Sequence, residues 1–250
     1  MAEGKREPGS PLRGYVISLR RAVLGVIRRI RRPACILFIG NSYTNHHGGV
    51  PRHLELMSAW KLHVESVTGD GYSLSHHWQK GEAINRIWNG RWDYVVLQEQ
   101  SQIPVLDCQA FSENVALFDR EIRSIGARTI LFVTWERPDS VGKGVTTDGL
   151  GAAYDAVGRE AGVGVVHVGR AFARSLALRP DILLNDPDGH PTASGTFLAA
   201  CVFYCTLLGR KPPRHHFTCI PLASDVKAHL KAVAGGALVS AGAPSRAREK

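Results

Sequence analysis

A short apolar run that starts at Cys35 ends abruptly in Gly40-Asn41-Ser42, which places a serine on a tight turn. An apolar run of strand length that stops at glycine and small polar residues indicates a buried β-strand followed by a turn. In open α/β sheets, the turns at the carboxyl ends of strands carry the reactive groups. Ser42 is therefore a candidate nucleophile, although Gly-Asn-Ser also forms ordinary turns.

A serine hydroxyl becomes a useful nucleophile only when other groups assist it. It needs an imidazole that takes its proton, a carboxylate that orients this imidazole, and hydrogen-bond donors for the oxyanion that forms. His190 is the candidate base, and Asp186 and Asp188 lie just before it. The candidate oxyanion donors are the backbone amides of Ser42 and Gly71 and the side-chain amide of Gln98 or Gln100.

The apolar patterns between these residues predict alternating strands and helices. Strands are expected at 35–39, 62–67, 92–97, 129–134 and 163–168, and helices at 51–60, 82–88, 111–125, 150–161, 170–178, 193–208 and 224–234. Alternation of this kind implies a parallel sheet with helices on both faces. Right-handed crossovers favour an α/β, doubly wound, five-stranded sheet of flavodoxin-like order. Polar residues follow the first four strands, so the site is expected at the carboxyl edge of the sheet.

Composition indicates one globular domain with a basic extension. The chain has 250 residues and 44% hydrophobic content, enough for one sizeable core. Residues 1–33 hold nine basic and two acidic residues, and so carry most of the formal net charge of +9. Nucleic-acid binding by the globular part is therefore not expected. We expect a basic, partly disordered extension over 1–33, a domain over 34–240 and a disordered tail over 241–250.

The extension has the apolar spacing of a basic amphipathic helix from Tyr15 to Arg32. Such helices lie on anionic membrane surfaces, so weak membrane-surface contact through residues 13–32 is one hypothesis. The alternatives are a solvated helix packed loosely on the domain and a start codon set too far upstream. No apolar stretch has the length of a membrane span, and no secretory signal is evident. We expect a cytoplasmic protein, at most peripheral to the inner membrane surface.

No metal or cofactor is expected. The five cysteines have no paired CxxC spacing, which favours neither a disulfide framework nor a zinc site. The adjacent histidine pairs at 46–47, 76–77 and 215–216 rarely face one centre, and no carboxylate accompanies them at ligand spacing. Cys201 and Cys205 are expected to be buried on an apolar helix.

Several aromatic residues are expected near the cleft. His46, His47 and His76 follow Ser42 and Gly71, so they are placed to line it. Trp78 and Trp135 could stack on a sugar, although tryptophans lie more often in the core or at its rim.

Four blocks of this sequence resemble those of the SGNH hydrolases, also called GDSL-like lipases and esterases. They are Gly40-Asn41-Ser42, the glycine Gly71 in GYSL, the polar cluster of WDYVVLQEQS, and HPTASGT from His190. The likeness covers about residues 36–209 and is closer to a bacterial branch with Gly-Asn-Ser in the first block. It implies a three-layer α/β/α sandwich and hydrolysis of an ester without metal. On this likeness Ser42 is the nucleophile, His190 the base and Gly71 an oxyanion donor.

Two positions depart from the pattern of that family. The third block lacks its asparagine; counted against the block, Gln100 takes its place, whereas Gln98 lies nearer the end of the strand. The family also has an acid three residues before the histidine, where this chain has Pro187. A one-residue deletion would make Asp188 the counterpart, which we favour over Asp186. If neither carboxylate reaches His190, a Ser-His dyad of weaker activity remains.

The sequence thus predicts a serine esterase of SGNH type that cleaves an acyl ester of a small molecule or glycan, for example an O-acetyl group on carbohydrate. The alternative hypothesis is a non-catalytic protein with this scaffold that binds a glycan or lipid, because the acid before His190 is displaced. The substrate rests on resemblance alone, since pocket shape cannot be read from sequence.

Overall fold

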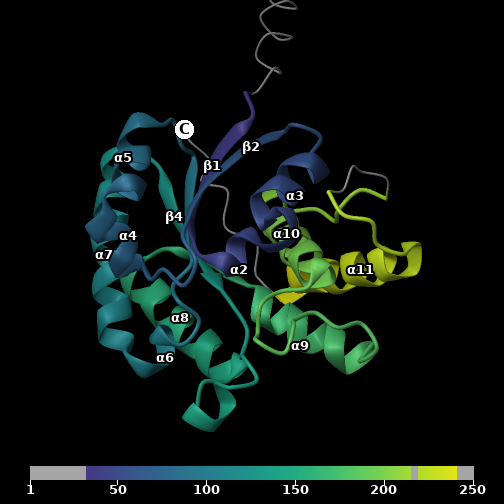
Figure 1. The fold of residues 1–250 in the computed structure, drawn as a ribbon. Helices are drawn as coiled ribbons and strands as arrows, with labels where there is room; N and C mark the ends of the chain where they lie inside the picture. Colours follow the sequence, from purple (N-terminus) through teal and green to yellow (C-terminus); the bar gives the residue numbers. More distant parts are fainter. Residues whose placement is uncertain (1–31, 215–218, 241–250) are drawn as a thin grey trace, which may run out of the picture. The chain divides into compact units, whose positions relative to one another are not determined.

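The structure, a computed structural model, describes residues 32–214 and 219–240 (Figure 1). The amphipathic helix expected up to Arg32 lies outside these residues except for its last position. The histidine pair at 215–216 and the tail over 241–250 also lie outside them. Within the described ranges, no helix has both the length and the apolar character needed to cross a membrane.

Five parallel strands form the central sheet, as the sequence predicts. They are β1 (Ala34–Gly40), β2 (Leu62–Thr68), β3 (Tyr94–Leu97), β4 (Arg128–Val133) and β5 (Gly164–His167), in the order β2-β1-β3-β4-β5. In register, Ile36 of β1 lies opposite Val64 of β2 on one side and Tyr94 of β3 on the other. The chain leaves β1 toward β2 and then returns to the other side of β1, so the connections diverge at the carboxyl ends of β1 and β3. In doubly wound sheets this point forms the ligand crevice.

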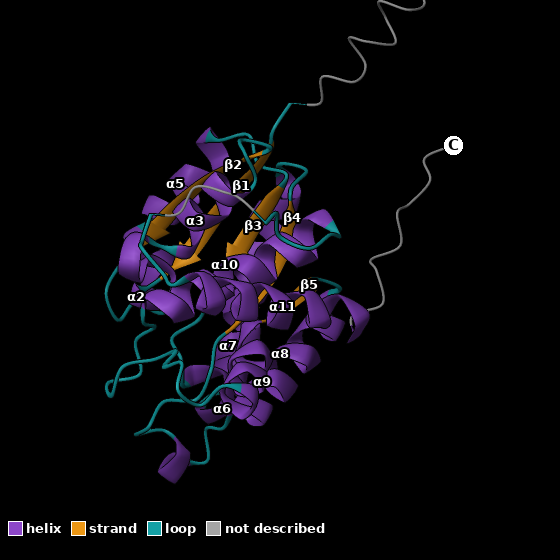
Figure 2. Cartoon of the chain, turned by 90° about the vertical axis from the view of Figure 1, so that its right-hand side faces the viewer, coloured by secondary structure: helices purple, strands orange, loops and turns teal. Residues whose placement is uncertain are grey.

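Helices cover both faces of the sheet, which gives a three-layer α/β/α sandwich (Figures 1 and 2). One layer contains α3 (Val50–Met57), α9 (Val168–Leu178), α10 (Ala193–Leu208) and α11 (Ser224–Ser240). The other contains α4 (Leu74–Lys80), α5 (Glu82–Asn89), α7 (Cys108–Ser124) and α8 (Thr147–Ala161). The short helices α2 (Ser42–Asn45) and α6 (Ile103–Leu106) follow β1 and β3.

The apolar run of β1 supplies both hydrophobic cores. Ile36 and Phe38 point into the core with α3 and α10, and Leu37 and Ile39 into the core with α4 and α7. All four side chains are fully buried. Successive strand residues face opposite sides, so a strand covered on both faces needs a continuous apolar run rather than an alternating one.

The helices α5, α10 and α11 begin at the expected residues, whereas α7 and α8 begin earlier because side-chain caps extend them. Asp107 accepts a hydrogen bond from the Ala110 amide, and α7 therefore begins before the first large apolar residue of its pattern. Thr146 caps α8 in the same way through the Gly149 amide. The expectation missed α4, which Ser73 caps and whose composition is rich in polar residues.

Candidate active site

The nucleophile turn, residues 40–44, connects β1 to the first turn of α2. Ser42 is the first residue of α2, and Asn41 caps the helix by accepting a hydrogen bond from the Tyr43 amide at 3.1 Å. The Asn41 side chain also donates to the Tyr72 carbonyl at 3.0 Å, which ties the turn to the segment after β2. The block Gly-Asn-Ser thus fixes the serine through its asparagine side chain.

Gln98, the first residue after β3, holds the nucleophile turn through hydrogen bonds of its side chain. Its Oε1 accepts hydrogen bonds from the Asn41 amide at 2.8 Å and from the Thr44 hydroxyl at 3.0 Å. Its Nε2 donates to the Glu99 carbonyl, and the side chain is fully buried. A Cβ on Gly40 would lie 2.6 Å from this Oε1, so only glycine fits there. The structure therefore does not bring Gln98, a candidate oxyanion donor, to the cavity: its amide is occupied in supporting the turn.

A buried histidine on α4, His77, also supports the nucleophile turn. The Nε2–H group of His77 donates to the Gly40 carbonyl at 2.7 Å. Burial lowers the pKa of His77, and the bond to Gly40 opposes this effect. The imidazole is therefore neutral near pH 7, and it is part of the packing around the end of β1.

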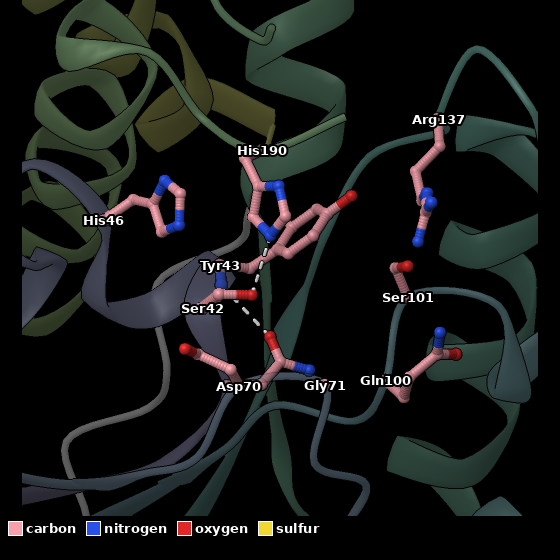
Figure 3. A pocket seen from close by; sticks show the side chains of 10 residues that line it. Ser42, Tyr43, His46, Asp70, Gly71, Gln100, Ser101, Arg137 and His190 are labelled. Carbon is pink, nitrogen blue, oxygen red and sulfur yellow. Dashed lines mark hydrogen bonds between the residues drawn. The ribbon is translucent and has the colours of Figure 1, made fainter. Parts of the chain in front are cut away.

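Ser42, His190 and Asp188 form one chain of contacts. Ser42 Oγ lies 2.9 Å from His190 Nε2, and His190 Nδ1 lies 2.9 Å from Asp188 Oδ2 (Figure 3). The other oxygen of Asp188 accepts the His190 backbone N–H at 3.1 Å. The hydrogen bonds from the ring and then from the backbone lower the pKa of Asp188, so it is ionised at neutral pH. This is the geometry of a serine, a base and an orienting carboxylate.

The histidine loop, residues 185–192, explains how an acid only two positions before His190 reaches its ring. The Gly189 amide donates to the Asp186 carbonyl and the Asp186 amide to the His190 carbonyl, both at 2.8 Å, so the chain folds into a tight turn. Asp188 projects from this turn back onto the imidazole. Asp186 contributes backbone groups, and its carboxylate makes no hydrogen bond to the His190 ring within the part of the chain described.

His46 stacks on the candidate base. The two imidazole rings are nearly parallel, at an interplanar angle of 6° and a centroid distance of 4.3 Å. Burial, followed by the proximity of His190, lowers the pKa of His46, which keeps it neutral beside the other ring. Of the other histidines expected at the cleft, His47 is exposed and His76 stacks on Tyr72 instead.

A cavity of about 310 Å³ opens above Ser42 (Figure 3). Its lining comes from the ends of four strands and from the histidine loop. The lining residues are Asn41, Ser42, Tyr43, His46, Asp70, Gly71, Gln100, Ser101, Arg137 and His190. Of the candidate oxyanion donors, Ser42, Gly71 and Gln100 thus line the cavity and Gln98 does not. The Gln100 Oε1 accepts the amides of Gln102 and Ile103, and no described residue accepts a hydrogen bond from its NH₂ group.

Glu99 joins two segments of the site and was not found by sequence reasoning. Its Oε1 accepts the Leu74 amide at 3.0 Å and the Gln100 amide at 2.7 Å, and thus links the segments after β2 and β3. The side chain is fully buried, and this burial raises the pKa of its carboxyl. A buried glutamate is rare, so composition alone gave no signal for it.

The remaining expectations concern tryptophans, cysteines and metals. Trp135 is buried and stacks on Phe172 at 3.9 Å, and Trp78 is half-buried against Phe118; neither lines the cavity above Ser42, where stacking on a sugar was expected. Cys201 and Cys205 are buried, as expected. No cluster of three or more metal-ligating side chains occurs among the described residues.

Comparison with known proteins adds evidence at the level of structure. No family model matches the sequence. No curated protein matches it either. A protein from Slackia heliotrinireducens assigned to the SGNH hydrolases superposes with a TM-score of 0.62 at 24% identity, covering 70% of this chain and 99% of its own. The present chain has the SGNH hydrolase fold.

Two further solved structures share this SGNH-like fold. A DUF4886 family protein from Bacteroides uniformis ATCC 8492 has a TM-score of 0.66 at 16% identity, with 83% of this chain and 95% of that chain covered. The acetyl xylan esterase AlAXEase has a TM-score of 0.54 at 13% identity, with 66% and 96% covered. At these identities the likeness concerns the fold, and the chemistry must be argued from the residues of this chain.

Proposed function

We propose that this chain is a serine esterase of the SGNH family that cleaves an acyl ester. The observation that carries the proposal is the contact chain at the carboxyl edge of the sheet, with 2.9 Å from Ser42 Oγ to His190 Nε2 and 2.9 Å from His190 Nδ1 to Asp188 Oδ2. Both distances are those of hydrogen bonds, and the first allows His190 to take the proton of the Ser42 hydroxyl.

The first half of the reaction acylates the serine. Ser42 Oγ attacks the carbonyl carbon of the ester while His190 Nε2 takes the hydroxyl proton, and the carbonyl electrons move onto its oxygen. The backbone amides of Ser42 and Gly71 and the side-chain amide of Gln100 donate to this oxyanion. When the tetrahedral intermediate collapses, the bond to the alcohol breaks and His190 returns the proton to the leaving oxygen.

The second half releases the acid. A water molecule gives a proton to His190 and attacks the acyl carbon. When the second intermediate collapses, the bond from this carbon to Ser42 Oγ breaks and His190 returns the proton to Oγ. Throughout, the Asp188 carboxylate holds the ring in the tautomer with the proton on Nδ1 and stabilises the imidazolium. The hypothesis of a protein that only binds its ligand depended on the displaced acid before His190. The close contact of Asp188 with His190 weakens that argument.

A small acyl group on a carbohydrate is the substrate class we favour. The cavity of about 310 Å³ is at the lower end of ligand pockets, and every residue that lines it except Gly71 has a side chain with a polar or charged group. Likeness to an acetyl xylan esterase adds fold-level support.

Turnover of p-nitrophenyl acetate tests the proposal. We expect Ser42→Ala and His190→Ala each to lower kcat/KM by about 10⁴-fold or more, because the nucleophile and base act as one unit. Ser124→Ala, which changes an exposed serine on α7, is the matched control and should leave the rate unchanged. Equal rates for the wild-type and Ser42→Ala proteins would overturn the nucleophile assignment.

A further inference from the structure

The wall of the cavity that faces away from His46 carries a polar cluster that the proposed mechanism does not use. It consists of Tyr43, Ser101 and Arg137, from the segments after β1, β3 and β4. In Figure 3 the Arg137 guanidinium points toward Ser101, and the Tyr43 ring extends from the nucleophile turn toward the same side. We call these three residues the arginine wall.

Arg137 has hydrogen-bond donors on this wall that no described residue takes up. Asp139 takes one edge of the guanidinium, with its Oδ1 accepting from Nε at 2.9 Å and its Oδ2 accepting from Nη2 at 3.3 Å. A guanidinium has five N–H donors and a second edge formed by its two terminal nitrogens. Among residues 32–214 and 219–240 no acceptor takes this second edge, which fits a planar, two-oxygen acceptor such as a carboxylate.

The packing holds Arg137 at the site rather than in the solvent. Its backbone amide donates to Ser140 Oγ at 2.9 Å, which fixes the segment after β4. Its stem lies against the histidine loop, because a Cβ on Gly189 would be only 2.7 Å from Arg137 Cγ. Gly189 also has a φ of +89°, a conformation that favours glycine. The position of Arg137 is therefore coupled to the loop that presents His190.

The Tyr43 hydroxyl is a second polar group on this wall. It is buried, and no residue that the structure describes makes a well-formed hydrogen bond to it, although the Ser101 side chain is close enough to lower its pKa. Burial raises the pKa of Tyr43 to about 12, and nearby Arg137 opposes the shift, so the phenol keeps its proton at neutral pH. Burying a hydroxyl without a well-formed hydrogen bond costs free energy. A bound acceptor, or a water molecule that bridges to it, lowers this cost.

The cavity is also polarised. Asp70 lines the wall opposite Arg137, close to Gly71 and the reacting serine (Figure 3). A substrate with a negative group is therefore favoured in one orientation only, with that group toward Arg137 and away from Asp70. From these observations we infer that the arginine wall binds a carboxylate carried by the ester substrate. This inference rests on the proposed esterase function, because that function is the reason for taking the ligand to be an ester.

Binding to the Ser42→Ala protein tests the inference without turnover, so a failure of the proposed esterase activity leaves it testable. Isothermal titration compares two pairs of esters. Monomethyl glutarate against dimethyl glutarate places the carboxylate in the acyl part, and acetoxyacetate against methyl acetoxyacetate places it in the alcohol part. In at least one pair the charged ester should bind about tenfold more tightly than its neutral partner, as expected for a charge-assisted, two-point contact. The pair that shows this ratio identifies the side of the ester that faces Arg137.

Three further changes in the Ser42→Ala background locate the effect. Arg137→Gln should bring the ratio to about one, and Arg120→Gln, an exposed arginine on α7, should leave it unchanged. Asp70→Asn should raise the ratio about twofold to threefold, because it removes the opposing charge. This last variant retains the wall and keeps the test open if Arg137→Gln fails to fold. A ratio of about one in both pairs for the parent protein, or a ratio that Arg137→Gln and Asp70→Asn leave unaltered, would overturn the inference.

Discussion

The nucleophile turn and the histidine loop present the two reacting side chains in different ways. The nucleophile turn is buried between both helical layers, and two side chains from distant segments, Gln98 and His77, form hydrogen bonds to it. The histidine loop lies at the surface and is shaped mostly by its own backbone, with exposed side-chain fractions of 29% for His190 and 66% for Asp188. Trp135 makes one contact with it from outside, by donating to the Gly189 carbonyl.

This difference separates two sources of catalytic geometry. The position of Ser42 depends on packing that also stabilises the domain, so disturbing it should affect folding. The orientation of His190 depends on a local turn and a solvent-exposed carboxylate, so disturbing it should affect the rate and little else. The following changes test this separation, and each compares two residues of the same type.

The largest effect is expected for the exposed acid. Asp188→Asn keeps the shape of the side chain but removes the charge that orients and stabilises the imidazolium, so kcat should fall about 10⁴-fold. Asp186→Asn should change kcat less than about twofold, because that residue contributes through its backbone. Steady-state rates and urea unfolding of both variants provide the measurement. Equal losses in the two variants would contradict the role given to Asp188, as would a large loss of stability in Asp188→Asn.

The second comparison concerns the two glutamines after β3. Gln98→Leu leaves the Asn41 amide and the Thr44 hydroxyl without their buried acceptor, so the free energy of unfolding should fall by about 3 kcal/mol. Gln100→Leu should lower it by less than about 1 kcal/mol while reducing kcat about 100- to 1000-fold, as for the loss of one oxyanion donor. Urea denaturation and ester turnover measure the two effects. If Gln98→Leu is as stable as the wild type, the support assigned to Gln98 is wrong.

The smallest effect is the pH dependence from His77. Its folded-state pKa is lowered by burial, so the unfolded chain takes up a proton first as the pH falls. The contribution of neutral His77 to the free energy of unfolding is therefore complete above about pH 6.5. Below this pH it falls by up to about 1.4 kcal/mol per pH unit. His77→Gln, which keeps a donor for the Gly40 carbonyl, should flatten the decline between pH 7.5 and 5.5. The exposed His63→Gln is the control, and identical slopes for the wild-type and His77→Gln proteins would refute this account.

Much of the fold follows from local patterns. The apolar run of β1, the helix periodicities and the rule for right-handed crossovers lead to the observed strand order. The convergence of Ser42, Gly71 and His190 at one edge of the sheet also follows, because parallel strands bring their carboxyl ends together.

Side-chain direction could not be predicted in the same way. Gln98 and Gln100 are two positions apart, and only packing around the Asn41 amide turns the first inward while the second lines the cavity. The choice between Asp186 and Asp188 depends on a turn closed by backbone hydrogen bonds. Arg137 could be recognised only as a charged residue after the fourth strand. Because it is far from Ser42 in sequence, its position in the cavity was not predicted.

Covalent trapping tests the central claim, an activated Ser42, most directly. A fluorophosphonate probe reacts with a serine hydroxyl only when a neighbouring base activates it. Intact mass and peptide mapping should show one adduct on Ser42 in the wild-type protein, none in Ser42→Ala and strongly slowed labelling in His190→Ala. Folded wild-type protein that remains unlabelled, or labelling that persists in Ser42→Ala, would contradict the account.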